Sequence, residues 1–255
     1  MKQYVFMLAL ITTSLIALVC EAKEDFTLYK ETALFKLFCT PVDHPIADAI
    51  LEHCEKNVDR LAEDFKHTYS NIISLYMYQN IQDFHEAISR PNAPDWIACS
   101  CSKEQRHSAL FVSPNNAGSY HSAKNILWLV SAALGELFIA DKFQHPLPRW
   151  LHAGIARYKA GTRYTESLGK LVLTQATLPT LSQLEPNGDD IAFGDDYHGY
   201  QCSYSLVEFL CTTWGWDKTL ELLDHYENFE SILGVSKAAF EAQWKVFLVQ
   251  HYGPK

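Results

Sequence analysis

The sequence predicts an α+β fold with two lobes, in which an N-terminal lobe of strands and helices precedes a helical C-terminal lobe. Short β-branched and aromatic runs alternate with helical patterns in the first half of the chain. In the second half, apolar residues recur at the spacing of helices. No repeat or low-complexity linker interrupts the pattern, so one domain is the economical arrangement. We expect the N-terminal α/β lobe to extend to about residue 118 and the helical part to cover 119–255.

Four strands are expected in the first lobe. Each is a short run of apolar, aromatic or β-branched residues, such as FKLFC and IISLYMY. The last two are joined by the charged turn KEQRH, which is typical of a hairpin. The four strands are placed at 35–39, 72–78, 96–102 and 108–113.

Helices are expected where apolar residues recur every three or four positions. Pro91 ends one of them, and Pro148 stands at the start of another, a position that proline tolerates. Residues 179–199 interrupt the series as an acidic loop, which we interpret as solvated, with calcium binding as the alternative. The helices are placed at 45–67, 81–90, 120–143, 148–160, 199–213, 217–226 and 236–251.

Composition and charge narrow the class of protein. The chain has 255 residues, of which 48% are hydrophobic and 20% charged, which suits a compact fold and excludes a disordered chain. The net charge is -9 and there is no run of Lys or Arg. Binding to nucleic acid or to an anionic membrane needs a basic patch, so we expect neither partner.

The N-terminus predicts export. Met1 and Lys2 precede an apolar run over 4–20, which resembles a secretory signal peptide covering 1–22. Cleavage after Ala22 would leave a secreted or periplasmic protein. The run is shorter than the ~20 residues of a membrane span, and we expect no span after cleavage. A lipoprotein attached through Cys20 and an uncleaved anchor are the alternatives.

Export permits disulfide bonds, and an even number of cysteines would remain after cleavage. Disulfide bonds are therefore expected, although the sequence does not fix their connectivity. Cys202 and Cys211 lie on one expected helix, roughly 13 Å apart, so they should not pair with each other. Buried free thiols are the alternative. The six cysteines are Cys39, Cys54, Cys99, Cys101, Cys202 and Cys211.

A series of motifs carries a family resemblance. FHEAISRPNAPDW and SALFVSPNNAG are followed by a long helix and then by LPRWLHAGIARYKAG, YSLVEFLCTTWGWDKTLELL and SKAAFEAQWKVFL. In this order, they resemble the peptidase MA-like family of gluzincin zinc metallopeptidases over nearly the whole mature chain. The resemblance implies a gluzincin-like two-lobed metallopeptidase fold, with a mixed sheet and helices in the N-terminal lobe and a helical C-terminal lobe. In that family the long helix carries H-E-x-x-H, and the next helix carries the third zinc ligand within P-x-W-L-x-E-G-x-A-x-Y.

The zinc motif is degenerate in this chain. Carried over from the resemblance, the first His falls on Ser131, the Glu on Ala132, the second His on Gly135 and the third ligand on Ala153. Zinc needs imidazole or carboxylate ligands and a carboxylate base, and none of these residues supplies one. We therefore expect no catalytic residue, no metal ligand and no zinc cofactor. Either the site has drifted, or a neutral cleft is retained for a ligand.

Other residues are candidates for lining that cleft. His152 adjoins the third-ligand position, and His121, His145 and His198 could lie within reach of the same cleft. A relocated metal site built from some of these histidines is an alternative. Tyr200 and Tyr204 enter the helix that flanks the cleft in a gluzincin. One of them could once have stabilised an oxyanion, although core packing is the simpler interpretation. The cleft candidates are therefore His152, His198, Tyr200 and Tyr204.

These expectations combine into one main hypothesis and two alternatives. The main hypothesis is an exported pseudopeptidase, not an enzyme, that binds a peptide or protein along the former active-site cleft. Strands within 97–113 could add a strand of ligand through main-chain hydrogen bonds. The alternatives are a hydrolase with a rebuilt, non-standard site and a purely structural or assembly protein.

Overall fold

The computed structural model describes residues 26–101, 107–116, 121–161, 164–174, 178–185, 193 and 198–254. The expected signal peptide, including Cys20, lies outside the described residues, as do most of the acidic loop and most of the turn KEQRH.

The N-terminal lobe is built on one five-stranded mixed sheet with the order β1-β2-β3-β5-β4. The two inner pairings, β2 with β3 and β3 with β5, are parallel, whereas β1 and β4 join at the edges as antiparallel strands. All four expected strands are present, β4 is shorter than expected, and β1 was not expected. The strands are β1 (Thr27–Glu31), β2 (Phe35–Cys39), β3 (Ile73–Tyr78), β4 (Cys99–Cys101) and β5 (Ser108–Val112).

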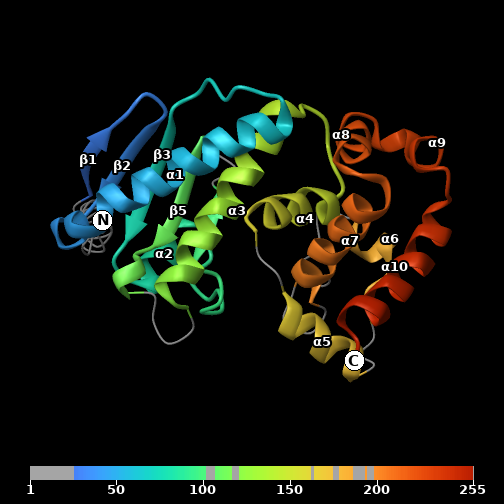
Figure 1. Ribbon diagram of the computed structural model, residues 1–255. Helices are drawn as coiled ribbons and strands as arrows, with labels where there is room; N and C mark the ends of the chain where they lie inside the picture. The colour runs from blue at the N-terminus through green and yellow to red at the C-terminus, as the bar shows by residue number, and fades with distance from the viewer. Residues whose placement is uncertain are drawn as a thin grey trace, which may run out of the picture.

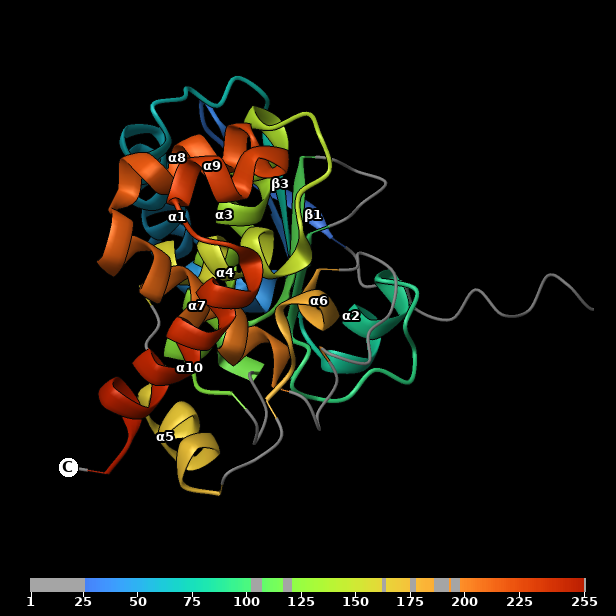
Figure 2. The same ribbon diagram turned by 90° about the vertical axis from the view of Figure 1, so that its right-hand side faces the viewer.

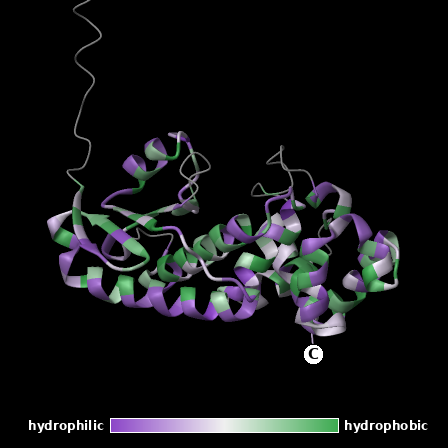
Figure 3. Ribbon diagram, turned by 90° about the horizontal axis from the view of Figure 1, so that it is seen from above, coloured by the Kyte–Doolittle hydropathy of each residue, from purple (hydrophilic) through white to green (hydrophobic). Residues whose placement is uncertain are grey.

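Helices cover both faces of this sheet. The long helices α1 (His44–Phe65) and α3 (Ala123–Lys142) lie against one face, and the short helix α2 (Ile81–Ala87) lies on the other side (Figure 2). Purple and green alternate along α1 in Figure 3, because its apolar residues face the sheet and its polar residues face outward. On the opposite face, Phe84 of α2 packs edge-on against Tyr78 of β3, with ring centroids 6.1 Å apart.

The C-terminal lobe is helical, as Figure 1 shows in yellow to red. Together with the mixed sheet, it confirms the α+β class predicted from the sequence. Helices α5, α6 and α9 were not expected. The helices of this lobe are α4 (Arg149–Lys159), α5 (Thr165–Leu173), α6 (Leu181–Leu184), α7 (Gly199–Trp214), α8 (Trp216–Asp224), α9 (Phe229–Leu233) and α10 (Lys237–Tyr252). Short 3-10 helices occur at Pro41–Asp43, Pro114–Asn116 and Tyr226–Asn228.

Helix α3 is the central helix of the molecule. Its 20 residues are long and apolar enough to cross a membrane by length and composition alone, although no such segment was expected after the signal peptide. In the fold, α3 packs against α1, α4, β4 and β5. The apolar composition of α3 is therefore explained by its burial in the core of the fold.

The described cysteines are free thiols, so the expected disulfide bonds are not found among them. Cys202 and Cys211 both lie on α7, as expected. Cys99 and Cys101 are alternate residues of β4, which places their Cα atoms about 6.6 Å apart, at the far end of the disulfide range. Burial raises the pKa of all six described cysteine thiols, to about 12 for Cys54 and Cys202.

Candidate functional site

Ser131, the first expected ligand position, faces α1. Its hydroxyl oxygen lies 2.8 Å from Nε2 of His53 on α1, and the hydroxyl is also within 3.1 Å of the Leu127 carbonyl one turn earlier on its own helix. Nε2 of His53 also lies 3.1 Å from the side-chain amide nitrogen of Asn57. Ser131 is therefore part of the packing contact between α1 and α3.

The Ser131–His53 pair has the spacing of a hydrolytic nucleophile and its base, but not their accessibility. Ser131 is only 3% exposed, and a substrate would have to displace α1 to reach its hydroxyl. Burial lowers the pKa of His53, which favours the neutral form of its imidazole. The pair is therefore better suited to joining two helices than to hydrolysis.

The other three expected positions are closed by packing. Ala132 and Ala153 are each 4% exposed and carry no metal-binding atom. Gly135 lies against α4, and a Cβ atom there would be 3.0 Å from the Cα atom of Ala156. Helices α3 and α4 are thus in close contact at this point, and a large side chain at 135 would push them apart.

An ion pair joins α3 to α4 beside these positions. Nη1 of Arg157 is 3.1 Å from a carboxylate oxygen of Glu136 and donates a second hydrogen bond, also of 3.1 Å, to the Ala153 carbonyl. The side chains are 11% exposed for Arg157 and 27% for Glu136. The pair was not predicted from the sequence, because its members lie on different helices and belong to no local motif.

The ring of Tyr200 lies over the guanidinium of Arg157. Its Cζ atom lies 3.9 Å from the ring centroid of Tyr200, a geometry that stabilises a cation. Burial lowers the pKa of Arg157, but Tyr164 and Glu136 outweigh that effect and raise the pKa above its usual value. The guanidinium is therefore a fixed positive charge between the two helices.

Tyr200 and Tyr204 have different surroundings on α7. Tyr200 lies between two arginines, since the Cζ atom of Arg149 is also 6.0 Å from its ring centroid. Its other ring contacts are with Phe193, at 5.1 Å, and Trp96, at 6.2 Å. Tyr204 is 2% exposed and packs in the core. Tyr200 thus lies directly against the ion pair, whereas Tyr204 packs on Tyr164, with ring centroids 5.5 Å apart.

The candidate histidines do not form a metal site. Nε2 of His152 is 3.3 Å from the backbone carbonyl of Glu136, so this ring contacts α3. His198 precedes α7 in the left-handed conformation, with φ of 49°. His121 and His145 lie near the backbone carbonyls of Trp96 and Pro146. Within the described part of the chain, no three His, Cys, Asp or Glu side chains are grouped to hold a metal ion.

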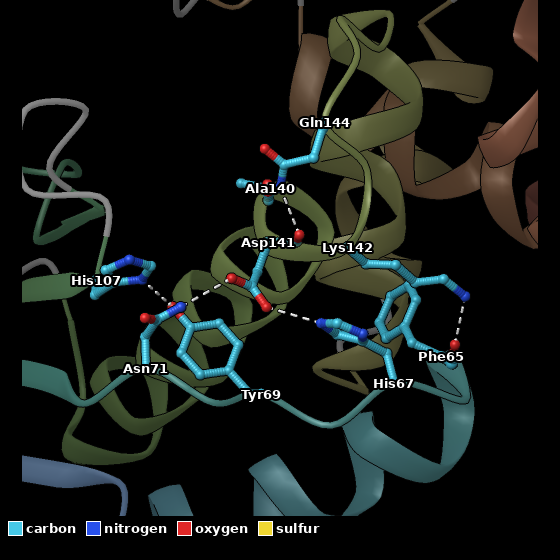
Figure 4. Close-up of polar contacts among 9 residues, drawn as sticks. All are labelled: Phe65, His67, Tyr69, Asn71, His107, Ala140, Asp141, Lys142 and Gln144. Carbon is cyan, nitrogen blue, oxygen red and sulfur yellow. Dashed lines mark hydrogen bonds and ion pairs between the residues drawn. The ribbon is translucent and has the colours of Figure 1, made fainter.

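A second polar cluster ties the end of α1 to the end of α3 (Figure 4). Nε2 of His67 is 2.8 Å from the Asp141 carboxylate, which also accepts a hydrogen bond of 3.2 Å from Asn71. Nearby, the Tyr69 hydroxyl is 2.8 Å from Nδ1 of His107. The cluster holds the chain between α1 and β3 against α3, and we assign it a structural role.

The residues at the expected zinc site do not fit that metal. Zinc in a gluzincin requires imidazole and carboxylate ligands with an open position for water. Here Ala132 and Ala153 supply no donor, the Ser131 hydroxyl is engaged with α1, and Arg157 brings a positive charge close to the third-ligand position. That guanidinium also holds the Glu136 carboxylate, which is therefore not free to bind a cation.

Comparison with known families extends the resemblance seen in the sequence. The model of the peptidase MA superfamily matches residues 53–250. The match begins in α1 and ends in α10, so it includes α3, α4 and the ion pair between them. A search of curated proteins finds no match to this chain.

Proposed function

Because the chain belongs to the peptidase MA superfamily, we propose that it is an exported, catalytically inactive member, which binds an extended peptide or protein segment beside the degenerate metal site. Export is supported by the signal-like sequence at 1–22.

The observation that carries the proposed inactivity is the chemistry of the α3–α4 contact. A zinc peptidase uses the metal to activate water and a carboxylate to accept the proton. At this contact, the carboxylate of Glu136 forms an ion pair with Arg157, and the two charges neutralise each other. A carboxylate in an ion pair is a weak base, because the neighbouring cation stabilises its charged form.

The proposed binding surface is the edge of the sheet at β4. Among the described strands, β4 is the last in the order and pairs only with β5. The Val112 amide bonds to the Ala98 carbonyl, and Ser100 lies opposite Leu110 in the same alternation. In an antiparallel ladder, the intervening residues direct their backbone groups away from the partner strand. Cys99 and Cys101 therefore direct an amide and a carbonyl each toward a bound segment, and the Cys101 carbonyl also accepts a 3.3 Å hydrogen bond from the Ser100 hydroxyl.

The first experiment tests inactivity. Mature protein, residues 23–255, is analysed for metals by mass spectrometry and incubated with casein. We expect less than about 0.1 zinc per chain and no cleavage, because the donor set that zinc requires is incomplete. About one zinc per chain, together with chelator-sensitive proteolysis, would overturn the proposal.

The second experiment tests binding. A library of extended ten-residue peptides is screened against the mature protein, and amide hydrogen exchange is measured with the best binder. The amides of Cys99 and Cys101 should become protected, whereas that of Ser100, which already faces β5, should change little. If no peptide binds, or if protection lies only elsewhere, a peptide-binding role at β4 is wrong. A structural role would then be favoured.

A further inference from the structure

Three contacts of α3 with its neighbours show which positions of the helix face α4. Ser131 contacts His53 on α1, so its face of the helix is turned toward α1. The carbonyl of Ala133 accepts a hydrogen bond from the Cys101 thiol, so that part of the helix lies against β4. Glu136 is bound to Arg157 on α4.

Residues four apart on a helix share a face, so Ala132 lies one turn before Glu136 on the side turned toward α4. Ser131 and Gly135 form a different pair of positions. Ser131 points at α1, and a Cβ atom at Gly135 would already lie 3.0 Å from the Cα atom of Ala156, so a side chain as large as imidazole would force α3 and α4 apart. Two metal ligands from α3 that meet one from α4 would therefore stand at 132 and 136.

On α4, the arginine of the same ion pair lies beside the third-ligand position, Ala153. Arg157 is four residues after Ala153 and donates to its carbonyl, so its guanidinium lies beside that turn of the helix. One cation thus links Glu136 on α3 with the backbone at Ala153 on α4. A metal ion with ligands at these positions would join the same two helices.

We propose that the Glu136–Arg157 ion pair occupies the place of the metal ion in this member of the superfamily, with the ligand positions at Ala132, Glu136 and Ala153 and the base at Ala133. The pattern H-E-x-x-H then falls on 132–136, one residue later than the positions expected from the sequence. The inference rests on the proposed loss of the zinc centre, and it adds that a guanidinium–carboxylate pair has taken over the link between the two helices.

Two sets of substitutions test the position of the site. The first variant carries A132H, A133E, E136H and A153E, with R157Q to remove the internal cation. The matched control carries S131H, A132E, G135H and A153E, also with R157Q. Circular dichroism first establishes folding, and calorimetry then measures the binding of zinc alone to each metal-free protein and to the parent.

The first variant should bind one zinc ion about 100-fold or more tightly than the parent, because two imidazoles and one carboxylate then converge. The control should fail to fold or bind zinc no better than the parent, since its imidazoles would point at α1 and into Ala156. A folded control that binds zinc as tightly as the first variant would overturn the inference. So would a folded first variant with no gain in affinity. If instead the parent itself binds one zinc, the proposed function fails as well.

A double-mutant cycle tests the ion pair even if the multiple variants do not fold. E136Q and R157Q are made singly and together in the parent. Each single substitution should lower the Tm by roughly 5–10 °C, and the double variant should lose clearly less than the sum. The same cycle at the exposed pair Glu166 and Lys170 on α5 is the control and should show little coupling. Additive losses at 136 and 157 would show that the pair does not link α3 to α4.

Discussion

Gly154 and Ser203 bring the backbones of α4 and α7 into direct contact. A Cβ atom at Gly154 would lie 2.3 Å from the carbonyl oxygen of Ser203 and 2.8 Å from its carbonyl carbon. No side chain fits at that distance, so glycine is required by the neighbouring backbone. The contact fixes α4, which carries Arg157, against α7, which carries Tyr200. It thereby helps to position the ion pair and the ring that covers it.

Replacing Gly154 with alanine should therefore destabilise the protein strongly. The added methyl group meets backbone, which cannot move away as a flexible side chain would, so α4 and α7 must separate. We expect the free energy of unfolding to fall by about 2–3 kcal/mol, as for other overpacked cores. Urea denaturation followed by circular dichroism measures the change.

Gly169 on α5 provides the matched control. A Cβ atom there would meet only the Tyr252 carbonyl, at an ordinary contact distance of 3.4 Å. Gly169→Ala should stabilise the protein by about 0.5–1 kcal/mol through helix propensity. Equal effects of the two substitutions would contradict the close contact between α4 and α7.

The burial of His53 between α1 and α3 predicts a loss of stability in mild acid. Burial lowers the pKa of His53 below 6.5 in the folded protein, so the unfolded chain binds the proton more readily. The stabilising contribution is complete above the unfolded pKa and is lost as the pH falls through the lower folded pKa. Unfolding free energies measured between pH 7.5 and 5 should therefore fall less steeply in His53→Gln than in the parent. His251→Gln, at an exposed position, should retain the dependence of the parent.

The buried thiols predict slow chemical modification of the native protein. The thiolate is the reactive form, and burial raises the pKa of Cys39 to about 11 and that of Cys54 and Cys202 to about 12. At pH 8, iodoacetamide should react slowly with the folded mature chain. In denaturant without a reducing agent, it should modify all six cysteines. Detection of fewer modified sites, restored by a reducing agent, would reveal disulfide bonds.

Local sequence patterns predicted most of the fold because the elements concerned have a clear buried face. The strand at 35–39 coincides with β2, and the helix at 120–143 matches α3 within a few residues. Strand β1 was missed because four of its five residues are exposed, so it shows no alternation of apolar and polar residues. Helix α6 was missed within the acidic loop, although Thr180 and Gln183 form a capping box that marks its start.

The candidate site could be predicted only in part. Local motifs indicated that α3 and α4 carry it, because each motif lies within one helix. The face that each residue of α3 presents is set by how α1, β4 and α4 pack around it, and this arrangement is not encoded in a short motif. Glu136 and Arg157 are 21 positions apart, and only the packing of the two helices makes them partners.

The buried carboxylate of Asp43 provides the last prediction. Asp43 is fully buried, and its carboxylate accepts hydrogen bonds from the Ser113 hydroxyl at 2.6 Å, from the Asn115 amide at 3.2 Å and from Gln79. These donors stand just after β3 and β5, so the carboxylate joins the ends of the two parallel strands to the start of α1. Asp43→Ala would leave several of these donors without an acceptor and should lower the free energy of unfolding by about 3 kcal/mol. Asp43→Asn should also be destabilising, because an amide nitrogen would then face other donors.

Asp48→Ala provides the control, because it removes an exposed carboxylate paired with Lys30 and should have little effect. Urea titrations of the three variants measure the difference, and an Asp43→Ala protein as stable as Asp48→Ala would show that this network does not hold the strand ends together.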